Sequence, residues 1–142
     1  LTRGCAALWI TNRTRANLDA LLALLAPVAG RIPLRGFAPA APPAALPAGA
    51  LVINTTSAGL RPYDPAPIDL AALPRPAAVF DMIYNPPRTA LLRAAAALGL
   101  PHANGLAMLV HQGAKSLEIW SGIPAAQTAP TMAAAARAAL AV

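Results

Sequence analysis

The clearest hydrophobic pattern in the sequence runs from Asn104 to Gly122 and predicts one buried helix. The apolar face has the three- and four-residue spacing of a helix and consists of Leu106, Leu109, Val110, Gly113, Leu117 and Trp120. Gly122, followed by a proline, supplies the stop, and a second face carries Met108, Gln112 and Lys115. An Asn-Gly start suits a helix whose first turn faces a ligand, although an ordinary amphipathic helix preceded by glycine has the same pattern.

Residues 31–34 and 100–103 are expected to form short strands. Clear apolar runs of strand length occupy residues 6–11, 51–54 and 77–80. Hydrophobic residues are continuous in these runs rather than alternating with polar ones, which indicates a parallel sheet covered on both faces. Residues 37–49 are dense in proline and alanine and are expected to form a loop.

Three further helices are expected. The first follows the first strand, with an apolar face of Leu18, Leu21, Leu22 and Leu25 and an end at Pro27 and Gly30. Thr89 caps the second, which Gly99 terminates. The last occupies the Ala-rich run that starts near Pro130 and reaches Val142.

The order of these elements predicts an α/β fold, a Rossmann-like parallel sheet with flanking helices. Three of the strands end in polar side chains. In open parallel sheets, ligands bind beyond the carboxyl ends of the strands, so this arrangement is typical of a nucleotide-binding domain.

Composition and charge exclude several classes of protein. Hydrophobic residues make up 57% of the 142 residues, but 16 prolines and the arginines interrupt every apolar run, so no membrane segment is expected. The net charge of +6 comes from scattered arginines rather than from a basic patch with interleaved aromatics, so no nucleic-acid partner is expected. The single cysteine, Cys5, excludes an internal disulfide, and two histidines give no metal cluster; these counts fit a cytoplasmic protein.

The tetrapeptide Asn12-Arg13-Thr14-Arg15 follows the first strand, where a dinucleotide fold recognises the adenosine ribose. A basic residue there pairs with the 2′-phosphate of NADP, and an acidic one hydrogen-bonds the ribose hydroxyls of NAD. The hydroxyl of Thr14 and the helix start also favour an anion. A helix cap with two solvated arginines is the alternative.

Two other strand ends carry polar groups. Residues 54–59, Asn-Thr-Thr-Ser-Ala-Gly, offer hydroxyls and amides to a ribose or diphosphate, or form an ordinary polar turn. Residues 81–84, Asp-Met-Ile-Tyr, place Met82 where it suits a nicotinamide ring and Tyr84 where it suits a substrate carboxylate. The alternative is a Met and a Tyr packed at a sheet edge.

Taken together, these motifs resemble shikimate dehydrogenase. The order is Asn-Arg-Thr after a strand, Asn-Thr-Thr-Ser-Ala-Gly, Asp-Met-Ile-Tyr-Asn-Pro, then Asn-Gly-Leu-Ala-Met-Leu-Val-His-Gln-Gly-Ala followed by Glu118, Trp120 and Gly122. The resemblance extends from Leu8 to about Pro124 and weakens in the last helix. It implies reversible hydride transfer between NADP and the shikimate/3-dehydroshikimate pair.

The resemblance also implies roles for individual residues. The cofactor side consists of Asn12, Arg13, Thr14, Arg15 and Asn17 at the 2′-phosphate, Thr56 and Ser57 in a second loop, and Met82, Gly105 and Met108 near the nicotinamide. Tyr84 and Gln112 are expected to hydrogen-bond the substrate. His111 has no catalytic counterpart in the family and is expected on the helix surface or in packing.

Departures from the family pattern concern the beginning of the chain. No Gly-rich diphosphate loop precedes residue 6, and the substrate domain that carries the family's catalytic Lys and Asp is missing, so no catalytic residue is assigned. We expect residues 1–103 to form a partial NADP-binding Rossmann domain, truncated at its N-terminus. Residues 104–142 are expected to form helices that pack on the missing catalytic domain. The chain is accordingly expected to be a carboxy-terminal portion without turnover of its own.

Two alternatives remain open at this stage. One is a quinate/shikimate dehydrogenase that uses NAD, against which Arg13 argues because NAD-preferring relatives usually have an acidic residue nearby. The other is a non-catalytic nucleotide-binding module, which the presence of both Tyr84 and Gln112 disfavours. The intact enzyme is expected to be a monomer or a homodimer.

Overall fold

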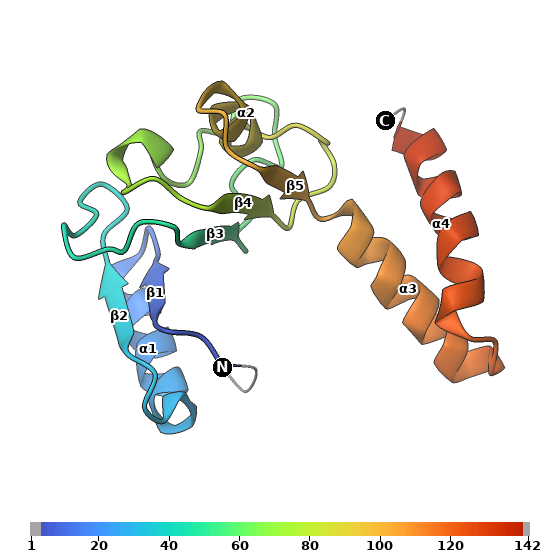
Figure 1. Ribbon diagram of the computed structural model, residues 1–142, viewed down its shortest axis with the longest axis horizontal. Helices are drawn as coiled ribbons and strands as arrows, with labels where there is room; N and C mark the ends of the chain where they lie inside the picture. Colours follow the sequence, from blue (N-terminus) through green and yellow to red (C-terminus); the bar gives the residue numbers. More distant parts are fainter. Residues whose placement is uncertain (1–3, 141–142) are drawn as a thin grey trace.

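Parallel strands and four helices make up the chain in the computed structural model, which describes residues 4–140 (Figure 1). In chain order the elements are β1 (Leu8–Thr11), α1 (Arg15–Ala29), β2 (Leu34–Phe37), β3 (Leu51–Asn54), η1 (Leu70–Ala72), β4 (Ala78–Asp81), α2 (Ala90–Ala97), β5 (His102–Asn104), α3 (Leu106–Ser121) and α4 (Ala125–Leu140). The expected α/β fold is confirmed. No helix among the described residues is long and apolar enough to cross a membrane.

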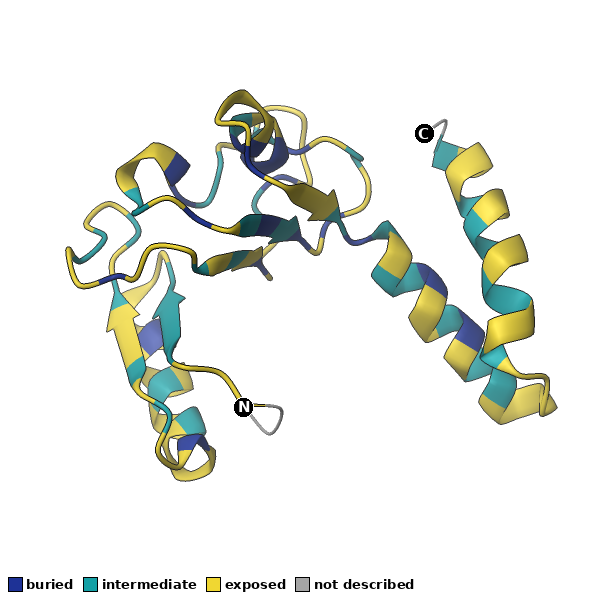
Figure 2. Cartoon of the chain, in the orientation of Figure 1, coloured by how far each residue is buried: buried dark blue, intermediate teal, exposed yellow. Residues whose placement is uncertain are grey.

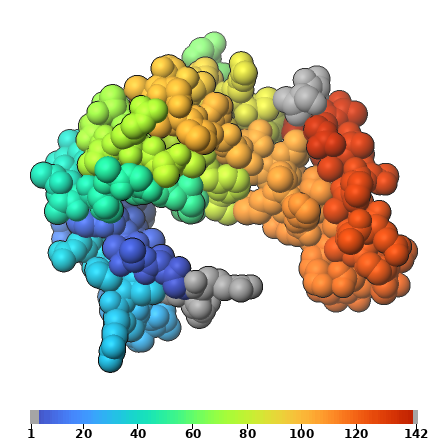
Figure 3. Space-filling model, in the orientation of Figure 1, coloured from blue at the N-terminus to red at the C-terminus, as the bar shows by residue number. Residues whose placement is uncertain are grey.

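The strands form two hydrogen-bonded sheets rather than one. β1 pairs in parallel with β2, with Leu8 opposite Leu34, and the second sheet has the order β3-β4-β5, also parallel throughout. β1 and β3 are therefore both edge strands. Figure 1 shows the β1–α1–β2 unit at one end of the molecule and the α3–α4 hairpin at the other, and the space-filling view in Figure 3 shows the hollow between them.

The main core lies between the three-stranded sheet and α2. Its buried members are Ile68, Leu70, Val79, Leu91, Leu92, Ala95 and Leu100. Thr89 begins α2 as expected, since its hydroxyl accepts a hydrogen bond from the amide of Leu92. Gly99, with a φ of 63°, follows the end of this helix and lets the chain turn into β5.

Two predictions of burial are wrong. The helix expected over 104–122 is present as α3, but most of it is exposed or half-buried (Figure 2). Only Val110 and Ala114 are buried in it, and Trp120 is 81% exposed. The sheet is not covered on both faces either, because Leu51 and Ile53 on β3 are 58% and 51% exposed. Apolar sequence alone does not reveal whether a neighbouring layer is present to cover it.

Some element boundaries also differ from the predictions. The second strand begins at Leu34 rather than at residue 31, and β5 occupies 102–104 rather than 100–103. The last helix starts at Ala125, with Pro130 in its second turn, and the end of the prediction at Val142 lies outside the described residues. Gly122, with a φ of 76°, makes the turn between α3 and α4.

Candidate functional site

The start of α1 presents a side-chain hydroxyl and backbone amides that no capping side chain of the helix occupies. The side-chain oxygen of Asn12 accepts a hydrogen bond from the amide of Thr14 at 2.8 Å, and this tight turn leads the chain from β1 into α1. Thr14 is the N-cap residue, but its side chain makes no capping hydrogen bond, and the first turn contains no acidic residue. Helix amides and a free hydroxyl at a helix start are suited to an anion.

Arginines flank this helix start, and they differ in their partners. Arg13 is exposed and makes no hydrogen bond or ion pair among the described residues. The Nε of Arg15 donates to both carboxylate oxygens of Asp19, each at 2.9 Å, and this bond raises the pKa of Arg15. Asn17, two residues after Arg15, is exposed. Five of the predicted cofactor residues thus lie within one short segment, with Arg15 already paired.

The ends of β3 and β4 are tied together by a buried polar network. Asp81, at 0% exposure, accepts hydrogen bonds from the Asn54 side-chain amide at 3.0 Å, from the Ile83 amide at 3.1 Å and from the Thr89 hydroxyl at 2.6 Å. Asn54 also donates to the carbonyl of Ala58. A buried carboxylate without a cation needs such donors. The network fixes the chain that follows both strands.

Thr56 belongs to the same network. Its hydroxyl donates to the Asn54 side-chain oxygen at 2.8 Å and accepts from the amide of Ala58 at 3.1 Å. Ser57 is exposed next to it. Further along this loop, Asp64 accepts from the amides of Arg61 and Gly59, which lowers the pKa of its carboxyl group. The loop holds its shape by internal hydrogen bonds, with Ser57 facing solvent.

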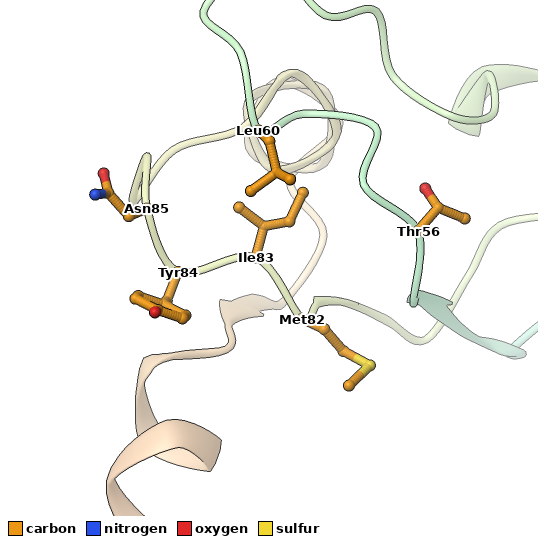
Figure 4. A pocket seen from close by; sticks show the side chains of 6 residues that line it. All are labelled: Thr56, Leu60, Met82, Ile83, Tyr84 and Asn85. Carbon is orange, nitrogen blue, oxygen red and sulfur yellow. The ribbon is translucent and has the colours of Figure 1, made fainter.

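A cavity of about 370 Å³ lies beside these strand ends, and Figure 4 shows the side chains that line it. The lining residues are Thr56, Leu60, Met82, Ile83, Tyr84 and Asn85. Leu60 and Ile83 point toward one another in this view, with Tyr84 on one side and Met82 on the other. Three of the predicted site residues, Thr56, Met82 and Tyr84, are therefore brought together.

Gly105 joins the start of α3 to the same place. Its amide donates to the carbonyl of Ile83, and a Cβ at this position would lie 2.0 Å from the carbonyl oxygen of Met82. The neighbouring Asn104 side chain accepts from the amide of Leu106 and donates to the carbonyl of Pro87. Only glycine allows the start of α3 to approach the Met82 backbone this closely.

Two predicted residues on α3 do not line the cavity. Met108 is half-buried in the first turn of the helix, and Gln112 is exposed further along it. His111 is exposed, as expected for a residue of the helix surface. A lone cysteine without a disulfide partner is expected to be a small buried hydrophobe, but Cys5 is exposed. The described residues contain no cluster of His, Cys, Asp or Glu suited to a metal ion.

Sequence reasoning did not assign a site role to Asn54, Asp81 or Thr89. Asn54 is the last residue of β3, Asp81 is the last residue of β4, and Thr89 directly precedes α2. The available signal was a polar residue directly after an apolar strand. Their convergence on one buried carboxylate depends on the parallel pairing of β3 with β4, in which Asn54 lies opposite Asp81.

Comparison with known proteins gives consistent results. The family model for the shikimate 5′-dehydrogenase C-terminal domain matches residues 105–137. The NADP(+) shikimate dehydrogenase of Methylobacterium radiotolerans is 42% identical over 120 residues, which are 84% of this chain and 41% of that protein.

Solved structures extend the comparison to the fold. Shikimate 5-dehydrogenase of Thermus thermophilus in complex with NADP(H) and shikimate has 34% identity and a TM-score of 0.68, covering 93% of this chain and 46% of that one. The 5-ketofructose reductase of a Gluconobacter strain has 35% identity and a TM-score of 0.68, covering 92% and 48%. The chain spans less than half the length of the proteins that it matches.

Proposed function

The chain is related to the shikimate dehydrogenases over the part of their length that it spans, and we propose that it supplies the NADP-binding side of such an enzyme. The reaction is the reversible reduction of 3-dehydroshikimate to shikimate. The observation that carries the proposal is the cavity at the end of β4, where Met82 and Tyr84 lie beside Gly105 and Thr56. In this proposal residues 1–103 belong to the NADP-binding domain and residues 104–142 form a helical segment that follows it.

The start of α1 fits the 2′-phosphate of NADP. Arg13 is free to donate to phosphate oxygens, and Thr14 has a hydroxyl that makes no capping bond. Asn12 shapes the turn through its bond to the Thr14 amide, while Arg15 and Asn17 flank the helix start. The absence of an acidic residue from the first turn favours a phosphate over the ribose hydroxyls of NAD.

The strand ends fit the nicotinamide and the substrate. NADP, when bound, supplies or accepts the hydride. Met82 and Gly105, which lie against one another, would border the ring, and Met108 in the first turn of α3 would approach it from outside the cavity. Thr56 and Ser57 would face the cofactor from the loop after β3. The Tyr84 hydroxyl would donate a hydrogen bond to the substrate, and the side-chain amide of Gln112 on α3 would provide a second hydrogen bond. The Asp81 network holds the Met82–Tyr84 backbone during this contact.

A chimeric enzyme tests this function. The 120 matched residues of the Methylobacterium radiotolerans enzyme are replaced by the corresponding residues of this chain. We expect the chimera to reduce NADP with shikimate, and Tyr84→Phe in the chimera to raise the KM for shikimate more than the KM for NADP. A folded chimera without activity contradicts the proposal.

The same assay separates the alternatives. Comparable rates with quinate and NAD would move the assignment to a broader dehydrogenase. Cofactor binding without reduction of either nucleotide would indicate a non-catalytic module. Direct titration of the 142-residue chain with NADP and NAD gives a second measurement that does not depend on folding of the chimera.

A further inference from the structure

We propose that Asp19 weakens the affinity of the α1 start for a 2′-phosphate by holding Arg15 in an ion pair that binding must break. The inference rests on the proposed function and names a specificity-determining residue within it. Asp19 touches neither cofactor nor substrate in this account. It acts through Arg15, and its effect is confined to ligands that carry the 2′-phosphate.

The geometry of the pair supports this role. Asp19 lies four residues after Arg15, one turn further along α1, and its two oxygens both accept from Nε at 2.9 Å. This contact engages the Nε of Arg15 with a carboxylate that lies one turn along α1 from the free groups at the helix start. Those groups are the Thr14 hydroxyl, which makes no capping bond, and the exposed Arg13.

The charge distribution supports it as well. Asp19 is the first acidic residue of the sequence, and the next one is Asp64. The single negative charge in the first 63 residues therefore lies one turn along α1 from Arg15 and two residues from Asn17. Repulsion of the phosphate by this carboxylate acts in the same direction as competition for Arg15, since both disfavour the bound state.

The expected size of the effect follows from exposure. The two side chains are 79% and 51% exposed, so the pair is weak and readily opened. An exposed ion pair of this kind changes an equilibrium by about two- to fivefold. Asp19 is thus suited to adjusting the affinity for the phosphate rather than to abolishing it.

The test is a nuclear magnetic resonance titration of the 142-residue chain, followed at the amides of Thr14 to Asn17. Adenosine 2′,5′-bisphosphate is the probe, and adenosine 5′-monophosphate is the ligand without the 2′-phosphate. We expect Asp19→Asn to tighten the bisphosphate by about two- to fivefold and to leave the monophosphate unchanged. Glu118→Gln is the matched control, because it makes the same charge change in the other ion pair of the described residues, Lys115–Glu118. It should change the affinity for neither nucleotide.

A double-mutant cycle identifies the route. In an Arg15→Gln background, Asp19→Asn should lose most of its effect, because no ion pair remains to be broken. If Asp19→Asn keeps its full effect in the Arg15→Gln background, Asp19 acts by repelling the phosphate rather than by competing for Arg15, and the proposal is overturned. Weaker binding of the bisphosphate in Asp19→Asn would also overturn it, because Asp19 would then orient Arg15 toward the phosphate. If the unmodified chain does not prefer the bisphosphate to the monophosphate, the proposed 2′-phosphate site itself is wrong. If the chain prefers the bisphosphate but Asp19→Asn does not change its affinity, only the role of Asp19 is wrong.

Discussion

Single residues decide the chemistry at the α1 start, and Arg13 is the most important of them. It is exposed beside a helix start that has no acid in its first turn. Arg15 has the same charge but is paired with Asp19. A guanidinium without a competing carboxylate is the better phosphate ligand, because no existing bond has to be broken.

Arg13→Asp should reverse the nucleotide preference. We expect the Kd for adenosine 2′,5′-bisphosphate to rise by about tenfold or more, since a hydrogen bond to a charged group contributes roughly 1.5–3 kcal/mol. Isothermal titration of the chain measures this change. Arg31→Asp makes the same charge change beyond the other end of α1 and is the control. Equal losses in both variants would indicate general electrostatics rather than a local contact.

Gly105→Ala should destabilise the chain by about 2 kcal/mol or more, because the added methyl group meets backbone that cannot move aside. The new Cβ would lie 2.0 Å from the Met82 carbonyl oxygen. Urea unfolding measures the loss. Gly113→Ala is the control, because its Cβ meets only the flexible end of Met132, at 2.9 Å, and alanine favours the helix. An unchanged free energy of unfolding in Gly105→Ala would show that α3 can shift away from β4.

At the scale of elements, the Asp81 network joins β3, β4 and α2. Its three donors come from Asn54, Ile83 and Thr89, each in a different part of the chain. Parallel pairing places the ends of β3 and β4 side by side, and α2 begins beside them. The site is therefore held by a junction of elements rather than by one loop.

Thr89→Val should cost about 2–4 kcal/mol, because it leaves a buried carboxylate short of one donor and removes the cap of α2. Thr89→Ser keeps the hydroxyl and should cost about 1 kcal/mol or less, for the lost methyl group. Chemical unfolding of both variants measures the difference. Similar losses in the two variants would attribute the effect to packing instead of hydrogen bonding.

The α3–α4 hairpin should weaken in acid. Glu118 accepts hydrogen bonds from Lys115 at 2.8 Å and from the Ala125 amide at 3.1 Å, and these lower its pKa from the ordinary value of 4.5. Because the folded pKa lies below the unfolded one, the contribution is fully present above about pH 4.5 and is lost as the pH falls through the folded pKa.

Hydrogen exchange of the α4 amides at several pH values measures this effect. The protection of α4 should fall below pH 4.5 in the unmodified chain and stay flatter in Glu118→Gln. A pH profile that is identical in the variant would assign the acid sensitivity to other groups, among them Asp64, whose pKa is also lowered.

At the scale of the whole molecule, the described chain leaves apolar sheet surface uncovered. β1 and β3 are each hydrogen-bonded on one side, and Leu51 and Ile53 are more than half exposed. Unpaired strand edges and exposed apolar patches favour association with other polypeptide. This surface is a property of the arrangement of layers, which no single strand reveals.

Replacing Leu51 and Ile53 together by threonine should reduce self-association of the chain, because it removes apolar surface from an exposed face. The free energy of unfolding should change by only about 0.5 kcal/mol per substitution. Sedimentation velocity measures the association. Val52→Thr, on the inner face of the same strand against the core, is the control and should lower stability instead. Unchanged association would show that this face is not the one that aggregates.

Much of the fold and of the site could be predicted from local pattern. The strand at 51–54, the Thr89 cap and the Gly99 stop are set by neighbours in sequence, so they are found without tertiary contacts. The grouping of Arg13 and Thr14 at a helix start is local as well. Met82 and Tyr84 are close to the cavity because they directly follow a strand.

The sequence by itself determined the parallel α/β class, the positions of the helices and the polar groups that follow each strand, because backbone propensity, capping and strand-end position are local. Only the tertiary structure decided which groups from different elements meet: Asn54 and Thr89 at Asp81, and Gly105 at the Met82 backbone. It also decided that Trp120 and the outer face of β3 are exposed. Burial depends on the layer that packs opposite, and that layer comes from distant parts of a polypeptide.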